Sequence, residues 1–271
     1  MKRILVPVDF SKEAENAAQV AVCIAKKSGG EVFLLHMLEL PEPTEYMITN
    51  QVEPLLYVNM AKKKFENFLK LPFFKSIKTH TKILYYKTLA GIKDESKALN
   101  IDLIVMGTKG VSGLTEVIIG SNTEKVVRRC NMPVLVIKES HKDFNIKQLV
   151  FPSDFSLTGK KSFQKVIAFC KFFNAKIHLL YVNTIYNFEK TTETLKNINN
   201  FIDGFNFSNY TVAIYNDVSV ERGILNYSKS IKADIIGIFT SGRTGLSKLF
   251  NGSIASEIAN HAMLPVVTFK I

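Results

Sequence analysis

The chain of 271 residues repeats itself once, and this repeat limits the folds that are open to it. The opening segment Leu5-Val-Pro-Val-Asp-Phe-Ser11 returns as Leu149-Val-Phe-Pro-Ser-Asp-Phe-Ser156, with its Pro, Asp, Phe and Ser displaced by 145 residues. A later set returns at a displacement of 132 residues, namely Asp102, Thr108, Gly110, Gly113, Leu114, Gly120, Ser121, Pro133 and Val134 as Asp234, Thr240, Gly242, Gly245, Leu246, Gly252, Ser253, Pro265 and Val266. This recurrence predicts two copies of one domain, residues 1–140 and 146–271, joined by a polar linker within 138–147.

Short β-branched runs alternate with segments of helical period in the first copy. Strands are expected at Ile4–Val8, Glu31–Leu38, Lys78–Tyr86, Ile101–Met106 and Pro133–Ile137, and helices at Lys12–Lys27, Gln51–Leu69, Gly91–Leu99 and Ser121–Cys130. Ser11 is the natural N-cap of the first helix. The alternation of apolar strands with helices predicts an α/β fold with a parallel, doubly wound sheet.

A glycine-rich segment follows the fourth expected strand and precedes a helix. Gly107, Gly110, Gly120 and Ser121 have the spacing G-x2-G-x9-G-S, which is neither Walker A nor G-x-G-x-x-G. Glycines let backbone N–H groups approach an anion, and a helix N-terminus favours negative charge, so the segment is a candidate phosphate cradle. The alternative is a plain strand-to-helix loop in which Ser121 caps the helix and Glu124 completes a capping box.

Composition and charge indicate the compartment and the possible partners of the protein more than its function. No apolar run reaches the roughly 18 residues of a membrane span, and Met1-Lys-Arg3 leads directly into a strand, so we expect a cytoplasmic protein that does not enter membranes. The formal charge of +11 would suit an anionic partner. The lysines are spread along the chain, however, including 138–147, which favours solvated faces and disfavours nucleic acid as a partner. Three scattered cysteines, Cys23, Cys130 and Cys170, are expected to be buried thiols in a reducing compartment.

The motifs resemble those of the universal stress protein family, and the resemblance covers nearly the whole chain, twice. It rests on Pro7-Val-Asp9, Leu34-Leu-His-Met37, Met106-Gly-Thr-Lys-Gly110, Gly120-Ser121 and Met132-Pro-Val-Leu-Val136, which occur in the family's order. It implies two Rossmann-like domains, each a five-stranded parallel sheet flanked by helices, packed as a pseudo-dimer through their last strands. Because the family divides into ATP-binding and non-binding kinds, it also implies a candidate ATP site.

In ATP-binding members, the aspartate after strand one and the backbone after strand two recognise adenine, while the glycine loop and its Ser or Thr hold ribose and phosphates. The resemblance therefore implies these nucleotide-binding residues: Pro7, Val8, Asp9, Met37, Met106, Gly107, Lys109, Gly110, Gly120, Ser121 and Asn122. A second site would use Ser153, Asp154, Gly242, Gly252 and Ser253. An aspartate can accept the exocyclic N–H of adenine, although Asp9 could instead be only a turn or capping carboxylate before Ser11.

The second copy departs from the pattern at Phe239, which stands where the first loop glycine, Gly107, belongs. A phenyl ring prevents the close backbone approach that glycine allows, so we expect weaker nucleotide binding in residues 146–271. The alternative is that Phe239 points into the core and the second loop still closes on phosphate. His36 is expected to be a satisfied core or edge histidine, and neither a metal-ligand cluster nor a catalytic constellation is recognisable.

These features support one leading hypothesis and two alternatives. The leading hypothesis is a stress-response regulatory protein that binds ATP or a related adenine nucleotide, optionally with Mg²⁺, chiefly in domain 1. The alternatives are a slow ATP hydrolase, disfavoured by the missing general base, and a nucleotide-free protein-interaction scaffold. Expected partners are the nucleotide, the other domain of the same chain, an unidentified protein and, as an option, a second copy in a homodimer.

Overall fold

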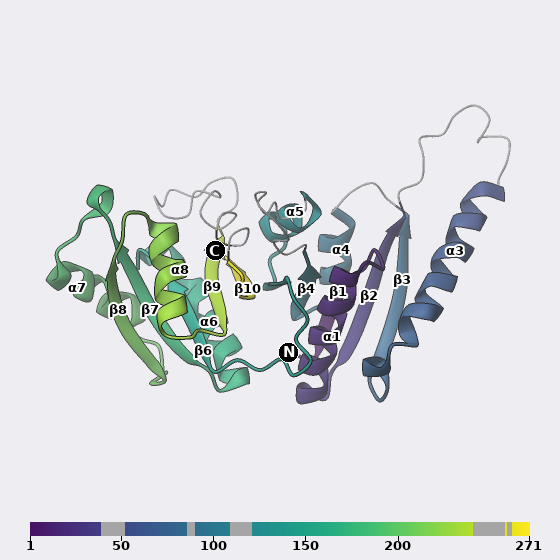
Figure 1. Cartoon of the computed structure of the whole chain (residues 1–271), viewed down its shortest axis with the longest axis horizontal. Coiled ribbons are helices and arrows are strands. Elements are labelled where there is room, and N and C mark those ends of the chain that lie inside the picture. Colours follow the sequence, from purple (N-terminus) through teal and green to yellow (C-terminus); the bar gives the residue numbers. More distant parts are fainter. Residues whose placement is uncertain (39–51, 86–89, 109–120, 241–257, 259–261) are drawn as a thin grey trace, which may run out of the picture. The chain divides into compact units, whose positions relative to one another are not determined.

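The computed structural model describes residues 1–38, 52–85, 90–108, 121–240, 258 and 262–271. The chain divides into two compact units (Figure 1). Unit 1 contains residues 1–108 and 139–144, and unit 2 contains residues 109–138 and 145–271. Helices separate most of the described strands in both units, which confirms the predicted α/β fold with mostly parallel sheets flanked by helices.

Unit 1 has a parallel sheet with the strand order β3-β2-β1-β4. Its elements are β1 (Arg3–Pro7), α1 (Lys12–Ser28), β2 (Glu31–Leu38), α3 (Val52–Leu69), β3 (Lys78–Tyr85), α4 (Ala90–Ala98) and β4 (Leu103–Gly107), with a short 3-10 helix at Pro72–Phe74. These bounds lie within two residues of the predicted ones. Ser11 caps α1 as predicted, because its side chain accepts a hydrogen bond from the backbone N–H of Ala14 at 3.2 Å.

Unit 2 has a sheet with the strand order β5-β10-β9-β6-β7-β8. Its helices are α5 (Ser121–Arg129), α6 (Lys160–Phe173), α7 (Thr191–Ile202) and α8 (Val220–Ser230), with 3-10 helices at Leu157–Gly159 and Ile185–Asn187. Its strands are β5 (Val134–Ile137), β6 (Gln148–Pro152), β7 (Lys176–Asn183), β8 (Tyr210–Asn216), β9 (Ile235–Thr240) and β10 (Val266–Lys270). The last strands of the two sequence copies, β5 and β10, pair antiparallel, with Val136 opposite Val266 and Val134 opposite Thr268. This pairing was predicted and is confirmed.

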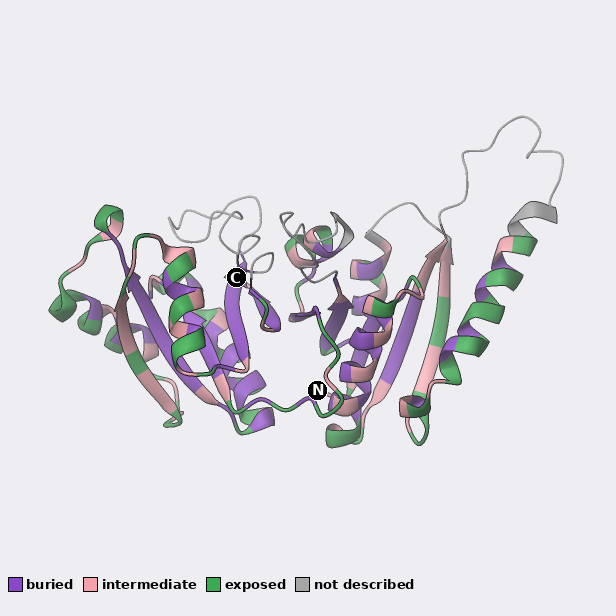
Figure 2. Ribbon diagram, in the orientation of Figure 1, coloured by how far each residue is buried: buried purple, intermediate pink, exposed green. Residues whose placement is uncertain are grey.

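The two faces of the unit 2 sheet bury different side chains. Aliphatic residues such as Val150, Leu180 and Ile236 pack on one face with Ile224 of α8. Adjacent residues point to the other face of a strand, so Phe151 meets Phe163 of α6 there, with ring centroids 5.1 Å apart. Figure 2 shows that the central strands are mostly buried and that the outer faces of the helices are exposed. The sheet thus has a covered core on each side, as doubly wound folds require.

Two predictions about side-chain burial need correction. Lys138, which was assigned to a polar linker, is only 5% exposed, and its ammonium donates a hydrogen bond to the carbonyl of Ala262 at 2.6 Å. Burial lowers the pKa of Lys138 to about 8. Cys130 and Cys170 are buried as expected, and burial raises the pKa of the Cys170 thiol to about 12, whereas Cys23 is only half-buried and donates to the carbonyl of Lys142.

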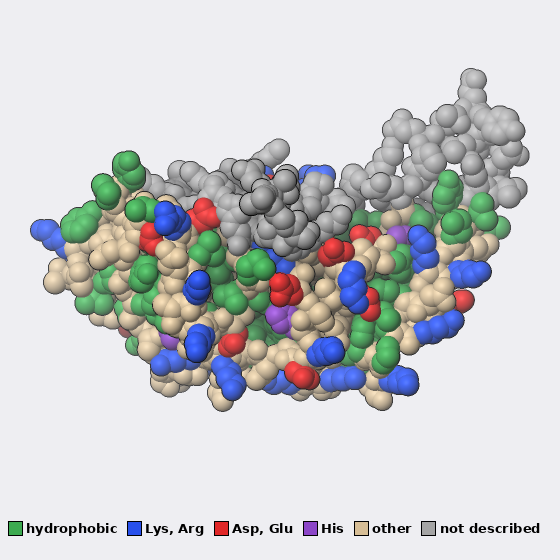
Figure 3. Space-filling view, viewed as in Figure 1, with side chains coloured by type: hydrophobic (Ala, Val, Ile, Leu, Met, Phe, Trp, Pro, Cys, Tyr) green, Lys and Arg blue, Asp and Glu red, His purple; other side chains and the backbone are tan. Residues whose placement is uncertain are grey.

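The lysines and arginines that Figure 3 displays agree with the expectation of solvated faces. On the face drawn in Figure 3, their side chains are scattered among hydrophobic and acidic ones and do not gather in one patch. None of the helices within the described ranges is both long and apolar enough to cross a membrane.

Candidate functional site

The strand order of unit 1 creates a switch point at the carboxyl end of β1. The chain proceeds from β1 to β2 and β3 on one side, and β4 then adds on the other side of β1. Ligands of open α/β sheets bind where the strand order reverses in this way. The predicted residues Pro7, Val8 and Asp9 end β1 or follow it, Met37 lies near the end of β2, and Met106 and Gly107 end β4. All of them therefore lie at one edge of the sheet.

Asp9 is exposed and is held by a turn of its own chain. Its Oδ1 accepts hydrogen bonds from the backbone N–H of Ser11, at 2.9 Å, and from the Ser11 hydroxyl. The Ser11 hydroxyl oxygen in turn accepts the Ala14 N–H, so the carboxylate is anchored to the start of α1. Its Oδ2 makes no hydrogen bond with any residue that the structure describes. The capping role considered for Asp9 is thus present, and it leaves one oxygen available to a ligand.

Phe10 holds this turn in an uncommon backbone conformation. Its φ is 66°, in the left-handed region, which costs an L-residue about 1–2 kcal/mol. The ring is packed tightly in return, with centroids 4.6 Å from His36, 5.1 Å from Phe65 and 5.8 Å from Phe68. Packing against α3 and β2 therefore stabilises the conformation that presents Asp9.

His36 is a satisfied structural side chain, as predicted. Its Nδ1 lies 2.7 Å from the carbonyl oxygen of Val8, so the tautomer protonated at Nδ1 donates to that carbonyl. The backbone N–H of the same residue, Val8, donates to the carbonyl of Leu35 at 2.8 Å. Together these bonds extend the pairing of β1 with β2 to the residue before Asp9.

Thr108 is a site residue to which the sequence assigned no role. It directly follows β4, is 5% exposed, and its hydroxyl oxygen is buried without a hydrogen-bond partner among the described residues. Thr240, its counterpart in the second copy, is 6% exposed and carries the same orphaned hydroxyl. Buried hydroxyls are nearly always paired, so the orphaned hydroxyls at both switch points are candidate binding groups. The only sequence signal was the repeat of Thr108 as Thr240.

Gly107 has a packing role that the sequence did not reveal. A Cβ at this position would lie 2.1 Å from the carbonyl oxygen of Glu13 and 3.0 Å from the nitrogen of Ala14. Both are backbone atoms at the start of α1, so glycine is required for the helix to pack against β4. The Gly107 hydrogen faces α1, and contact between its backbone N–H and phosphate stays a prediction.

In the second copy, the contact between strand and helix has its small residue, Gly159, on the helix side. Phe239 is 1% exposed, packs edge-on against Phe151 at 4.9 Å, and reaches Gly159 before α6. A Cβ on Gly159 would lie 2.6 Å from Cε2 of the Phe239 ring. Phe239 therefore points into the core, as one alternative expected, and whether the second loop closes on phosphate stays a prediction. The phenyl ring gives no reason to expect weaker binding in this copy.

Asp154 repeats the geometry of Asp9 in unit 2. Its Oδ1 accepts the Ser156 N–H at 3.0 Å, and Phe155 after it has φ 53°. Ser153 is buried, and its hydroxyl oxygen accepts the Phe155 N–H at 2.9 Å. The turn that presents the carboxylate has therefore been retained in both copies.

A second carboxylate, Glu189, was not predicted, and its charge acts on the same tyrosine, Tyr181, as that of Asp154. Burial raises the pKa of Tyr181, and the negative charges of Glu189 and Asp154 add to this effect. Glu189 accepts hydrogen bonds from the Thr194 hydroxyl at 2.7 Å and from the Asn197 amide at 3.0 Å, and its backbone N–H donates to Asn183. Two carboxylates at this strand edge disfavour an anionic ligand.

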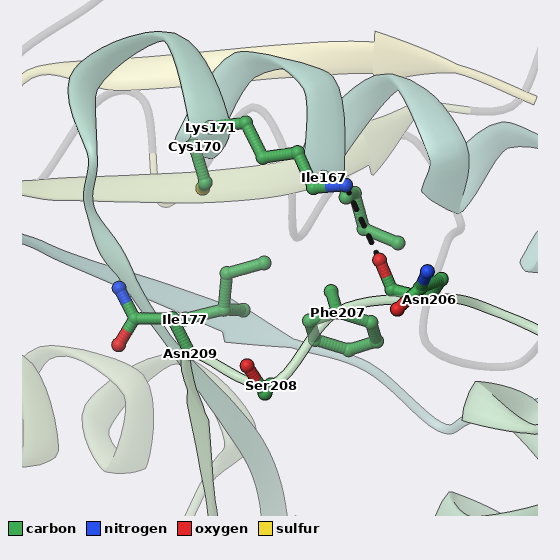
Figure 4. A pocket seen from close by; sticks show the side chains of 8 residues that line it. All are labelled: Ile167, Cys170, Lys171, Ile177, Asn206, Phe207, Ser208 and Asn209. Atoms are coloured by element: carbon green, nitrogen blue, oxygen red, sulfur yellow. Dashed lines mark hydrogen bonds between the residues drawn. The ribbon is translucent and has the colours of Figure 1, made fainter.

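The remaining predicted residues are not placed in either site. Ser121 and Asn122 open α5 in unit 2. Lys109, Gly110, Gly120, Gly242, Gly252 and Ser253 lie outside the described residues. A cavity of about 290 Å³ in unit 2 is a different feature (Figure 4). It lies between α6 and the segment entering β8, near Cys170, Ile177 and Phe207, at the strand edge opposite Asp154.

Comparison with known proteins finds one family in both parts of the chain. The model of the universal stress protein family matches residues 1–138 and 211–270. A universal stress protein of Methanocaldococcus jannaschii is 30% identical over 156 residues, covering 52% of this chain and 96% of that protein. One of Bacillus subtilis is 28% identical over 149 residues, covering 50% of this chain and 98% of that protein. The crystal structure of a universal stress protein from Archaeoglobus fulgidus has the same fold over both copies, with a TM-score of 0.70, 19% identity and coverage of 99% of this chain and 98% of that one.

Proposed function

Because the chain belongs to the universal stress protein family, we propose that it is a regulatory protein that binds ATP or a related adenine nucleotide, chiefly through its first domain, residues 1–140. The observation that carries this proposal is the pair of groups at the unit 1 switch point. Asp9 presents Oδ2 at the end of β1, and Thr108 has an orphaned hydroxyl at the end of the neighbouring β4.

The chemistry of these two groups suits an adenine nucleoside. A carboxylate oxygen accepts the N–H of the exocyclic amine of adenine, whereas guanine has a carbonyl at that position and would be repelled. A threonine hydroxyl can donate to or accept from a sugar hydroxyl or a phosphate oxygen. Base recognition in the proposal thus belongs to Asp9, and Thr108 contributes to the polar remainder of the ligand.

Calorimetric titration of the full chain with ATP and GTP tests the role of Asp9. A hydrogen bond to a charged group contributes about 2 kcal/mol, so Asp9→Ala should weaken ATP binding by roughly thirtyfold and remove the preference over GTP. Asp143→Ala is the matched control, because it removes an exposed carboxylate from the linker. Equal ATP affinity in the Asp9 and Asp143 variants would exclude Asp9 from the site.

Thr108→Val gives a second, independent test because valine has nearly the same shape. Removing an unpaired buried hydroxyl should raise the stability of the ligand-free protein by about 1 kcal/mol, while ATP affinity falls about fivefold or more. If Thr108 were only structural, Thr108→Val would change the stability of the protein and leave its ATP affinity unchanged.

The second domain, residues 146–271, is proposed to be the weaker site because Glu189 adds a second negative charge beside Tyr181, on which the charge of Asp154 also acts. Glu189→Gln should therefore strengthen ATP binding to the Gly110→Val variant, in which the first site is disabled. A turnover assay with Mg²⁺ measures whether bound ATP is hydrolysed, and mass spectrometry of the purified protein shows whether any nucleotide is bound at all. Copurification of no nucleotide together with no titratable binding would favour the scaffold alternative.

A further inference from the structure

Strand β8 is the free edge of the unit 2 sheet. It pairs with β7 along its whole length, from Tyr210 opposite Ile177 to Asn216 opposite Asn183, and it ends the strand order. No described strand pairs with its other side, as Figure 1 shows. Val212, next to the central residue of the strand, is 37% exposed. An edge of this kind presents a row of backbone N–H and C=O groups to any strand that can reach it.

The composition of β8 lacks the features that protect edge strands. Its sequence, Tyr210-Thr-Val-Ala-Ile-Tyr-Asn216, has no charged residue, no proline and no glycine, and most of its residues favour β-structure. Proteins normally place lysine, proline or a bulge on an open edge to prevent pairing. The edge strand of unit 1, β3, follows that rule with Lys78, His80 and Lys82. Of these two edge strands, β3 is therefore protected by charged or polar side chains, and β8 is open to pairing.

We infer that β8 pairs with β8 of a second copy of this chain, antiparallel, about a twofold axis at Ala213. In this register Val212 lies opposite Ile214 of the other copy and Thr211 opposite Tyr215. These are the β-branched and aromatic cross-strand pairs that stabilise antiparallel sheets, and no like charges meet. The same arrangement at β3 would bring Lys78, His80 and Lys82 of two copies into one ladder.

A twofold pair would satisfy the backbone hydrogen-bonding groups of β8 and would be a closed dimer. Each β8 uses its only free side, so the assembly stops at two copies and does not grow into a fibre. A second copy also matches β8 better than an unrelated extended peptide does, because the strand is complementary to itself in charge and in side-chain size along all of its seven residues.

The first test measures the mass of the full chain by light scattering and sedimentation over a range of concentrations. The unmodified protein should form dimers, and Val212→Lys should weaken dimerisation at least tenfold, because it places a charge on the paired edge of each copy. Thr81→Lys on β3 is the matched control, with the same charge added to the other edge strand, and should not change the association. A protein that is monomeric up to about 100 µM, or a Val212→Lys variant that dimerises as well as its parent, would overturn the inference.

The second test measures the register by disulfide formation under mild oxidation. Facing residues of an antiparallel pair have Cα atoms about 4.5–5.5 Å apart, within the range of about 4.4–6.8 Å that a disulfide spans. Ala213→Cys should therefore cross-link two chains rapidly. Thr211→Cys should not, because the two copies of residue 211 would be about 14 Å apart along the strands. The unmodified protein, which has cysteines of its own, gives the background level of cross-linking. Cross-linking of the Thr211 variant alone, or of neither variant above this background, would contradict the pairing.

Discussion

Replacing Gly107 by alanine should destabilise the protein by about 3 kcal/mol, because the added methyl group has no space at the contact between β4 and α1. The new Cβ would lie 2.1 Å from the Glu13 oxygen and 2.3 Å from the Glu13 carbonyl carbon. Both are backbone atoms and cannot rotate away, so the first turn of α1 must move. Overpacking costs about 1–3 kcal/mol, and a rigid backbone neighbour places this substitution at the upper end.

Urea unfolding followed by circular dichroism measures this loss, and thermal unfolding should show a decrease in Tm of roughly 10 °C. Gly91→Ala is the matched control. Its Cβ would lie 3.2 Å from Cδ1 of Leu84, which is a movable side chain, and alanine favours the helix, so its stability should stay within about 1 kcal/mol of the parent. If Gly107→Ala unfolds within about 0.5 kcal/mol of the parent, α1 is not packed against β4 in the way described, and the packing role of Gly107 is wrong.

The second copy offers a double-mutant test of the same contact. Gly159→Ala should cost about 2 kcal/mol in the unmodified chain, because its Cβ would meet the Phe239 ring at 2.6 Å. In a Phe239→Leu background the cost should fall by half or more, since the ring is gone. Equal costs in both backgrounds would show that the two residues are not coupled.

Three further predictions concern charge, ligand and cap. Lys138 has a folded-state pKa of about 8, below its ordinary 10.5, so the unfolded chain binds more protons than the folded one between these pH values and stability should rise with pH through that window. Lys138→Met should remove this pH dependence and add about 2 kcal/mol of stability at pH 7. Urea unfolding at several pH values measures it, and an unchanged pH dependence in the variant would contradict the prediction. Gly110→Val should abolish ATP binding in domain 1 while circular dichroism shows an intact fold; unaltered affinity by calorimetry would remove the glycine loop from the site. Ser11→Ala should cost about 1 kcal/mol of stability through the lost cap. It should also weaken ATP binding, because Asp9 loses the hydroxyl, one of its two hydrogen-bond donors. A loss of stability without a loss of affinity would separate the cap from the ligand.

The secondary structure could be predicted closely because its signals are local. Apolar runs bounded by glycine, proline or aspartate defined the strands, and Ser11 marked the start of α1 by the chemistry of its own side chain. The β5–β10 pairing could also be anticipated, because the repeat supplied two equivalent last strands and the family resemblance supplied the way in which they pair.

The features that could not be predicted depend on contacts between distant residues. Lys138 looked like a linker lysine, since nothing in its neighbours along the chain shows that Ala262 and a buried environment surround it. The packing roles of Gly107 and Phe239 were missed for the same reason. The small residue lies on the strand in one copy and on the helix side, at Gly159, in the other. Glu189 gave no signal at all, because it has no counterpart in the repeat.

The antiparallel pairing of β5 with β10 also has a consequence for synthesis of the chain. β5 leaves the ribosome complete at Ile137, yet the strand that covers its edge begins only at Val266. At a translation rate of about 5–20 residues per second, the apolar edge Val134–Ile137 waits on the order of 10 s for its partner. During this interval a nascent chain can pair with β5 of a neighbour on the same messenger RNA, so slowing translation after codon 138 should increase swapped or aggregated product.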